Sequence, residues 1–390
     1  MSTGRVVLCG ADVVLPDRVA TNLTVVIEGG RITDLVSGPR EVGAGETRVD
    51  LSGHLIVPGF IDVHVHGVCG VDVLDGDAAV SQVARLLPQF GVTAFCPTTV
   101  ACTPTVLAGF LQQVANARAL VPGDSARVLP AHLETPFINP DFRGAQPSEA
   151  LATWMDSPKA EQNTYLSPDV AILTIAPEMP GGLELLAQAR AAGIRVSLGH
   201  TGATFDQAIH AIDCGANHAT HLFNRMTPMS HRDPGVVGAV LAREDVAAEI
   251  IGDGAHVHPA VIRVAIAAKG AQRVMAITDG TAGSGLPKGS CARLGGRRIT
   301  VADTALLDDG TLAGSVATMD RVFSTLVTRA GQSLVDAATV CATTPARELG
   351  LARQGAIVPG YLADLTVLTS SLTVAQTWIG GVRTSPPVSA

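Results

Sequence analysis

Short apolar runs recur through the middle of the chain, between residues 58 and 350. Most are followed by a polar or glycine-containing turn and then by an alanine- and leucine-rich stretch typical of a helix. The apolar runs lie at residues 60–65, 92–96, 128–133, 170–175, 194–198, 219–223, 247–251 and 274–277. The helical stretches include residues 80–90, 106–120, 183–192, 205–214 and 259–269. Eight strand–helix units in about 250–300 residues predict an α/β fold, a (β/α)8 TIM-type barrel.

A doubly wound parallel sheet is the competing architecture, because it also alternates strands with helices. Such a sheet normally carries a glycine-rich nucleotide-binding loop after its first strand. Residues 60–67 contain no GxGxxG motif. The barrel is therefore the favoured prediction.

The two ends of the chain follow a different pattern. Residues 6–15, 23–28 and 31–36 are short apolar runs, and Gly29 and Gly30 join the last two, which predicts a β-hairpin. Similar runs at residues 365–368 and 377–382 precede the C-terminus. Neither end alone could bury one face of a sheet. We therefore expect a small β-sandwich domain built from residues 1–57 and 351–390, beside a barrel of residues 58–350.

Composition and charge limit the possible partners and location. The chain has 390 residues, 47% of them hydrophobic, and a formal net charge of −8. The negative charge argues against nucleic-acid binding, and the absence of a run of about 18 uncharged apolar residues argues against a membrane span. The seven cysteines are scattered without a CxxC pair, and the first 20 residues do not resemble a signal peptide. These features predict a cytoplasmic protein with reduced thiols.

Histidine and carboxylate side chains stand at the ends of five predicted barrel strands. They are His64, His66, Glu134, His200, His221 and Asp279. The carboxyl ends of barrel strands meet at one face, which is where barrel enzymes carry their active sites. Nitrogen and oxygen ligands of this kind suit one or two divalent transition-metal ions. Zinc is the default for such a set, and iron or cobalt would bind similarly.

Each of these residues also has a purely structural interpretation. The HxH pair formed by His64 and His66 is a weak indication on its own. A histidine at a strand end is often only hydrogen-bonded, and Glu134 could instead pair with a buried arginine. The prediction of a metal site therefore depends on the convergence of the whole group at one face.

Several motifs resemble those of the amidohydrolase superfamily. The segment PGFIDVHVHG at residues 58–67 is typical of the superfamily as a whole. HLE followed by PF at residues 132–137, and HLFN at residues 221–224, are similar to the N-acetylglucosamine-6-phosphate deacetylase family in particular. Further matches lie at residues 198–201, 253–256, 278–280, 312–315 and 355–368. The resemblance extends over nearly the whole chain.

The resemblance implies a metal-dependent hydrolase in amino sugar catabolism and cell-wall recycling. Its substrate would be N-acetyl-D-glucosamine 6-phosphate, and its products D-glucosamine 6-phosphate and acetate. Asp279 would act as general base and then as proton donor to the leaving amine, besides being a metal ligand. Many relatives bridge two metals with a carbamylated lysine, but none of the three lysines here ends a predicted strand. Glu134 is therefore expected to be the bridging or primary ligand.

The resemblance also implies a substrate-binding set. The phosphate would contact Asn224, the backbone amide of residue 225, His256 and Arg232. Arg232 would reach in from the neighbouring subunit of a homodimer, although without the resemblance it would be interpreted as a solvated loop charge. The remaining residues implied at the substrate are Gln146, Arg225, Leu312, Ala313 and Gly314.

Three positions depart from the pattern usual in the family. Thr135 replaces a glycine after HLE, and threonine tolerates a positive φ poorly, so we expect the loop backbone to differ there. Gln146 replaces a histidine thought to donate a hydrogen bond to the substrate; glutamine can also donate but carries no charge. Arg225 replaces an alanine, and would either add a cation near the phosphate or point into solvent.

Two other functions stay open on these observations. The same chemistry could serve a deacetylase of another N-acyl sugar phosphate or N-acyl amino compound. A superfamily member without catalytic activity could instead act as a binding or assembly protein. Such proteins lose metal ligands, whereas this chain keeps all six candidate ligands.

Overall fold

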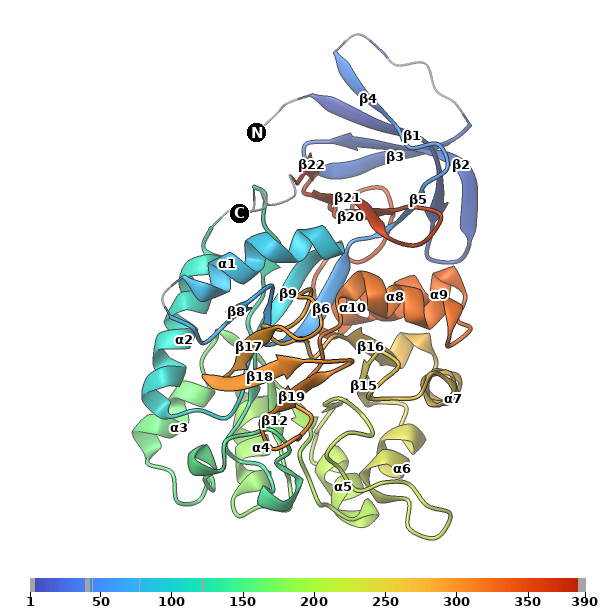
Figure 1. The fold of residues 1–390 in the computed structure, drawn as a ribbon. Helices are drawn as coiled ribbons and strands as arrows, with labels where there is room; N and C mark the ends of the chain where they lie inside the picture. The colour runs from blue at the N-terminus through green and yellow to red at the C-terminus, as the bar shows by residue number, and fades with distance from the viewer. Residues whose placement is uncertain (1–3, 39–42, 44, 77, 121–122, 385–390) are drawn as a thin grey trace.

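The centre of the molecule is a barrel of parallel strands (Figure 1). The computed structural model describes residues 4–38, 43, 45–76, 78–120 and 123–384. Neighbouring strands follow the order β6-β9-β11-β12-β13-β14-β15-β16, and the short β10 also pairs with β9. Their bounds are β6 (Phe60–Val65), β9 (Val92–Thr99), β10 (Arg127–Val128), β11 (Ala131–Glu134), β12 (Val170–Ile175), β13 (Arg195–Leu198), β14 (His218–Ala219), β15 (Ala247–Ile251) and β16 (Val274–Ile277). The predicted (β/α)8 barrel is confirmed.

The barrel closes between β16 and β6, at residues predicted to carry chemistry. The backbone N–H of Asp279 donates to the His64 carbonyl at 3.0 Å. The backbone N–H of His66 donates to the Gly280 carbonyl at 2.7 Å. Closure of the sheet therefore fixes the first and last strand ends of the candidate site against each other.

Helices surround the barrel strands (Figure 1). They are α1 (Ala79–Leu86), α2 (Pro104–Arg118), α3 (Lys159–Tyr165), α4 (Gly182–Ala191), α5 (Phe205–Asp213), α6 (Gly235–Ala242), α7 (Pro259–Lys269), α8 (Met319–Thr328), α9 (Leu334–Ala338) and α10 (Thr344–Glu348). Short 3-10 helices are η1 (Leu87–Phe90), η2 (Pro140–Phe142), η3 (Ser148–Ala150) and η4 (Ala271–Arg273), and η5 (Thr339–Thr343) is a π-helix. In the described residues, no helix has the length and apolar character needed to cross a membrane.

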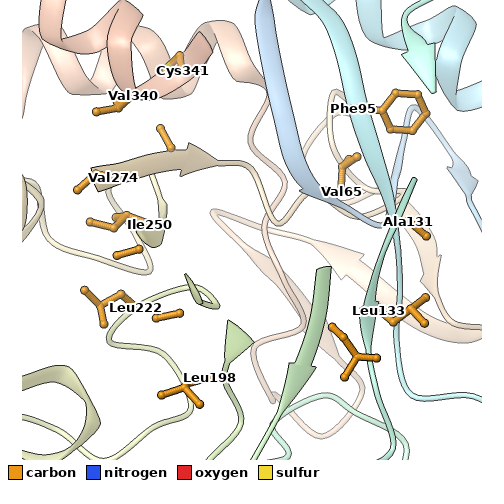
Figure 2. Close-up of a cluster of buried hydrophobic side chains, with 14 of the residues drawn as sticks. Val65, Phe95, Ala131, Leu133, Leu198, Leu222, Ile250, Val274, Val340 and Cys341 are labelled. Carbon is orange, nitrogen blue, oxygen red and sulfur yellow. The ribbon is translucent and has the colours of Figure 1, made fainter. Parts of the chain in front are cut away.

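Apolar side chains fill both the outside and the inside of the barrel wall. Figure 2 shows members of the larger cluster, among them Leu133 on β11, Leu198 on β13 and Ile250 on β15. A second cluster includes Ile61 on β6 and Ile172 on β12, strands separated by two others in the barrel. The barrel interior is therefore packed with side chains, which leaves the strand ends as the place for a site.

Strands from both chain ends form one sheet beside the barrel (Figure 1). Its order is β22-β21-β20-β5-β1-β2-β3, with β4 also paired to β1. Arg31 forms a bridge with Leu362, so the sheet curls around a core drawn from both ends. The predicted hairpin turns at Gly29 and Gly30, whose φ of 57° and 77° suits a primed turn. The strands are β1 (Arg5–Val14), β2 (Val19–Glu28), β3 (Arg31–Ser37), β4 (Glu46–Asp50), β5 (Leu55–Pro58), β20 (Leu365–Leu368), β21 (Val374–Ile379) and β22 (Val382–Arg383).

Two predicted strands differ from the observed ones. The run at residues 128–133 is divided into β10 and β11, because Pro130 between them has no N–H for the ladder. The run at residues 219–223 contributes only the end of β14, since the chain turns at His221, where φ is 32°. Both candidate ligands, Glu134 and His221, nevertheless stay at the same end of the barrel.

A three-stranded antiparallel sheet follows β16 and is absent from the predicted elements. It consists of β17 (Cys291–Leu294), β18 (Arg297–Val301) and β19 (Ala305–Leu307), and two further short strands, β7 (Gly67–Val68) and β8 (Val71–Asp72), form a separate hairpin. Gly295 and Gly296 turn the first hairpin, with the same two-glycine pattern as Gly29 and Gly30. Leu294 packs with Val100 in an apolar cluster. This sheet forms one wall of the candidate site.

Candidate metal centre and substrate pocket

The structure brings the six predicted ligands together as two groups of three. In the first group, Asp279 Oδ1 lies 3.2 Å from His66 Nε2 and 3.3 Å from His64 Nε2. In the second, Glu134 Oε1 lies 2.9 Å from His200 Nε2 and 3.1 Å from His221 Nε2. All six side chains are buried. Each group places its donor atoms close enough to share one metal ion.

Glu134 stands between the two groups. Its Oε2 lies 3.5 Å from His66 Nε2, and its Oε1 lies 3.7 Å from His64 Nε2. Since Oε1 also contacts His200 and His221, the carboxylate reaches both groups, with Oε1 against the second and Oε2 against the first. This is the placement that a bridging ligand needs, and it agrees with the role expected from the sequence.

The hydrogen bonds of the histidine rings present their Nε2 atoms to the site. His66 Nδ1 lies 3.0 Å from the Thr98 carbonyl, and His200 Nδ1 lies 3.0 Å from the Phe142 carbonyl. A carbonyl oxygen can only accept, so each Nδ1 carries the proton and each Nε2 keeps its lone pair. Anchored imidazoles with free Nε2 atoms are typical of metal ligands. The donor set therefore fits a divalent metal.

The imidazoles keep both carboxylates ionised. Burial alone would raise the pKa of Glu134, but His200, His221 and His64 hold it well below its usual range. Burial would also raise the pKa of Asp279, and His64 and His66 again lower it. Burial would lower the pKa of His66, but the same carboxylates raise it to about 9, so a bound metal ion would take the place of a proton there.

Three of the six candidate ligands have an unusual backbone conformation. His200, His221 and Asp279 have φ values of 47°, 32° and 48°, in the left-handed region that non-glycine residues seldom occupy. Each lies just beyond the end of its strand, where the chain turns sharply. Backbone strain of this kind is concentrated at functional sites, because it aims a side chain that a regular strand would direct elsewhere.

A cavity of about 400 Å³ opens beside the donor atoms. Of the residues expected at the substrate, six line it: Gln146, Asn224, Arg225, His256, Leu312 and Gly314. Ala313 is fully buried in the apolar cluster with Leu294 and is not part of the lining. Arg232 is exposed on the loop before α6 and is also not part of the lining within this chain.

Gln146 is hydrogen-bonded to Glu134 of the candidate metal centre. The Ala101 backbone N–H donates to Gln146 Oε1 at 2.7 Å, so the side-chain amide group must face the other way. Gln146 Nε2 accordingly donates to Glu134 Oε2 at 2.5 Å. Gln146 therefore orients the carboxylate between the two ligand groups, besides lining the pocket.

The substitution at Thr135 does not strain the loop. Thr135 is not among the non-glycine residues with positive φ. Its hydroxyl donates to the Thr174 carbonyl at 2.7 Å and accepts from the Phe137 N–H at 3.2 Å. Thr135 thus avoids the positive φ that threonine tolerates poorly, and two hydrogen bonds hold its side chain; the expected difference from the family's loop stays a prediction.

Polar groups gather on the side of the pocket expected to hold the phosphate. His256 Nδ1 lies 2.7 Å from Asp253 Oδ2, which leaves Nε2 available to the pocket. Asn224 also lines the pocket, beside Arg225, which is the one arginine among the described lining residues. Arg225 packs along Gly144 and is exposed at the pocket rim, so it supplies a cation there.

Gly314 is required by a close approach to the candidate base. Its φ is 65°, and a Cβ atom there would lie 2.8 Å from the Asp279 carbonyl oxygen. Ser315, the next residue, donates its backbone N–H to the same oxygen at 2.8 Å. This segment therefore fixes the backbone of Asp279 against the end of the barrel.

Sequence reasoning missed Glu249, a fully buried glutamate on β15. Its Oε2 lies 3.0 Å from Nδ1 of the candidate ligand His64. Its position in the sequence could have revealed it, because Glu249 is the one charged residue in the otherwise apolar strand Ala247–Ile251. A carboxylate in such a run is costly to bury and therefore calls for a specific partner.

Comparison with known proteins agrees with this geometry. Residues 55–384 match the model of the amidohydrolase family. N-acetylglucosamine-6-phosphate deacetylase from Bacillus subtilis (strain 168) is 34% identical over 379 residues, covering 94% of this chain and 93% of that protein. N-acetylgalactosamine-6-phosphate deacetylase from Escherichia coli O157:H7 is 34% identical over 330 residues, covering 84% and 87%.

A solved structure of a deacetylase is also similar to this chain over nearly its whole length. It is a mutant of N-acetyl-D-glucosamine-6-phosphate deacetylase from Mycobacterium smegmatis in complex with N-acetyl-D-glucosamine-6-phosphate. Its TM-score is 0.87 at 32% identity, covering 97% of this chain and 99% of that one. The chain therefore belongs to the amidohydrolase superfamily and, within it, to the N-acetylglucosamine-6-phosphate deacetylase family.

Proposed function

We propose that this protein hydrolyses the acetamide of N-acetyl-D-glucosamine 6-phosphate to D-glucosamine 6-phosphate and acetate. The observation that carries the proposal is the convergence of two groups of metal donors beside one polar pocket. The cavity, about 400 Å³, is of a size suited to a phosphorylated monosaccharide. The family's curated members carry this activity in their names, which supports the choice of substrate.

Two divalent ions per subunit are proposed for the donor set. His64, His66 and Asp279 would hold one, and His200 and His221 the other, with Glu134 between them. Zinc is the proposed metal, and iron and cobalt share the same ligand preference. When bound, such an ion supplies an acidified water molecule as nucleophile and polarises the acetamide carbonyl.

Asp279 moves the proton in the proposed reaction. Its buried carboxylate has a lowered pKa and therefore begins the cycle ionised. It accepts a proton from the attacking water as the new C–O bond forms. It then donates that proton to the sugar nitrogen as the C–N bond breaks, which releases acetate and the free amine.

The phosphate is proposed to lie against Asn224, His256 and Arg225, with Arg232 contributed by the neighbouring subunit of a homodimer. Arg232 is exposed and lies outside its own pocket lining, which supports a role for its guanidinium in a second copy. An arginine can grip a phosphate through two hydrogen bonds.

Replacing Arg232 with alanine tests that role. We expect KM for the phosphorylated substrate to rise by about 10- to 100-fold, the effect of losing one charged hydrogen bond. Hydrolysis of N-acetylglucosamine without phosphate should be unaffected. Arg263→Ala, at an exposed arginine on α7, is the matched control. An unchanged KM in the Arg232 variant would remove this residue from the phosphate site.

Acetate release from a small substrate panel tests the function itself. We expect N-acetylglucosamine 6-phosphate to give the highest kcat/KM, above its galactosamine epimer and above the unphosphorylated sugar. Chelation should abolish release, and added zinc should restore it. A preference for the epimer or for a non-phosphorylated amide would assign a different substrate. No acetate from any acetamide by the metal-loaded protein would support the non-catalytic alternative.

The location and the domain limits are also proposals. All seven cysteines are unpaired, which supports the cytoplasm as the compartment. The division proposed at residue 57 falls within the last strand of the N-terminal part of the sheet, β5 (Leu55–Pro58), and the division at residue 350 follows α10. Limited proteolysis that cleaves between these two bodies would test the division.

A further inference from the structure

We propose that Glu249 is a positioning residue of the metal centre. Its carboxylate holds His64 in the Nδ1–H tautomer, so that Nε2 of that ring is presented to the metal. The inference rests on the metal site of the proposed function and does not depend on which acetylated sugar is the substrate.

The first observation is the burial of a carboxylate that has no lysine or arginine partner among the described residues. Glu249 has no exposed surface, and its carboxylate lies against the imidazoles of His64 and His132 and the backbone N–H of His221. Burying a carboxylate in the middle of an apolar strand is unfavourable unless strong hydrogen bonds compensate. Packing alone would be better served by an aliphatic residue there, so the carboxylate has another role.

The second observation is the direction of its contacts. Oε2 lies 3.0 Å from His64 Nδ1 and accepts from the His221 N–H at 3.4 Å. His64 Nε2 points into the first ligand group, 3.3 Å from His66 Nε2 and 3.3 Å from Asp279 Oδ1. An ionised carboxylate can only accept, so with Glu249 in its charged form the ring proton stays on Nδ1. Glu249 thus contacts two ligand residues without being in the pocket lining.

The third observation separates His64 from the other anchored ligands. The Nδ1 atoms of His66 and His200 donate to neutral backbone carbonyls, whereas that of His64 donates to a carboxylate. A carboxylate partner makes the imidazole a stronger donor to a metal than a carbonyl does, in the arrangement carboxylate–histidine–metal. Glu249 should therefore affect both the aim of His64 and the strength of its bond to the metal.

The surroundings of the second oxygen show what a glutamine would do. Oε1 has no hydrogen-bond partner and lies 3.6 Å from His132 Nδ1. That nitrogen carries its own proton, since it lies 3.1 Å from the Val63 carbonyl. An NH2 group at the Oε1 position would face that donor at 3.6 Å, whereas at the Oε2 position it would face two closer donors, His64 Nδ1 and the His221 N–H. The amide oxygen is therefore expected at the Oε2 position, so Glu249→Gln should keep the tautomer while losing the charge.

Metal affinity, measured by competition with a chromophoric chelator, tests the proposal on the purified full chain. Glu249→Ala should weaken zinc binding by about 10- to 100-fold, the range seen when a partner of a ligating histidine is removed. Glu249→Gln should recover part of that loss. Glu178→Gln is the matched control, because Glu178 is also close to the site but accepts from Asn139, Thr201 and Gly202 and touches no ligand ring. Its affinity should stay within a few-fold of the parent.

Nitrogen-15 NMR of the metal-free protein supplies a readout independent of activity. The His64 ring, assigned through its loss in a His64→Gln variant, should show a protonated Nδ1 in the parent and in Glu249→Gln. In Glu249→Ala it should show a mixture of tautomers.

If the alanine variant does not fold, the glutamine variant alone should show the retained tautomer and a weaker affinity than the parent. Parent-like affinity in the alanine variant, or in the glutamine variant where only that one folds, would overturn the proposal. An unchanged His64 tautomer in the alanine variant would do the same. If the proposed substrate is wrong, the zinc affinity and the His64 tautomer would still follow these expectations, because neither measurement involves substrate.

Discussion

Replacing Asp279 with asparagine is expected to lower kcat for acetate release by about 10²- to 10⁴-fold, the usual contribution of a general acid–base group. Asparagine has almost the same shape and keeps an oxygen toward His64 and His66, so the metals should stay largely bound. It cannot accept the proton of the attacking water or return it to the amine. The loss should therefore appear in kcat and in kcat/KM together, with little change in KM.

Metal content and a second buried aspartate control this experiment. Elemental analysis should give a ratio of metal to protein close to that of the parent. Asp72→Asn removes another buried carboxylate, one that accepts from the backbone N–H groups of Leu74 and Gly295, and should cost far less turnover. Near-parental turnover in Asp279→Asn would show that another group moves the proton.

The convergence of the six candidate ligands could be predicted from the sequence, because strand ends can be located in it. An apolar run that stops at a histidine or carboxylate marks a strand end, and parallel strands bring those ends together. His64 and Glu134 were found in this way although β10 and β11 are divided at Pro130. The prediction tolerated errors of a few residues in strand bounds, because only the common end of the barrel mattered.

Contacts between residues that are far apart in the sequence could not be predicted from the pattern of apolar and polar positions. Glu249 and His64 are 185 positions apart, and only the closed barrel sets their side chains against each other. The contact between Gln146 and Glu134 depends on a loop that returns to Ala101. The sheet β17–β19 was not predicted because its strands are short, although Gly295 and Gly296 form the two-glycine turn that is typical of a hairpin.

Left-handed backbone at the ligands also lay beyond sequence reasoning. Glycine and asparagine are the residues expected at positive φ, yet His200, His221 and Asp279 occupy it here. Local preference disfavours this conformation, so the surrounding sheet must impose it. The residues that depart from local backbone preference are thus candidate metal ligands, and functional sites are where such departures are expected.

Glu134 is the residue whose removal should disturb the site most. It lies within 3.7 Å of all four ligand imidazoles, and no other ligand contacts both groups so evenly. Without its charge, four imidazoles would face one another with Asp279 as the only ligand anion. Both metal positions should then weaken together, whereas a change at His200 should weaken mainly the second.

Replacing Glu134 with alanine is therefore expected to lower bound metal and turnover together. Loss of the Lewis acid, worth several kcal/mol, corresponds to a fall in kcat of about a thousandfold or more. Elemental analysis and acetate release, measured on the same preparation, check both effects. Gln146→Ala is the comparison variant, because it keeps the Glu134 carboxylate and removes a side chain that donates to it, accepts from the Ala101 N–H and lines the pocket. It should give a smaller loss of bound metal. Full metal content with near-parental turnover in Glu134→Ala would contradict a bridging role and would return that role to another ligand.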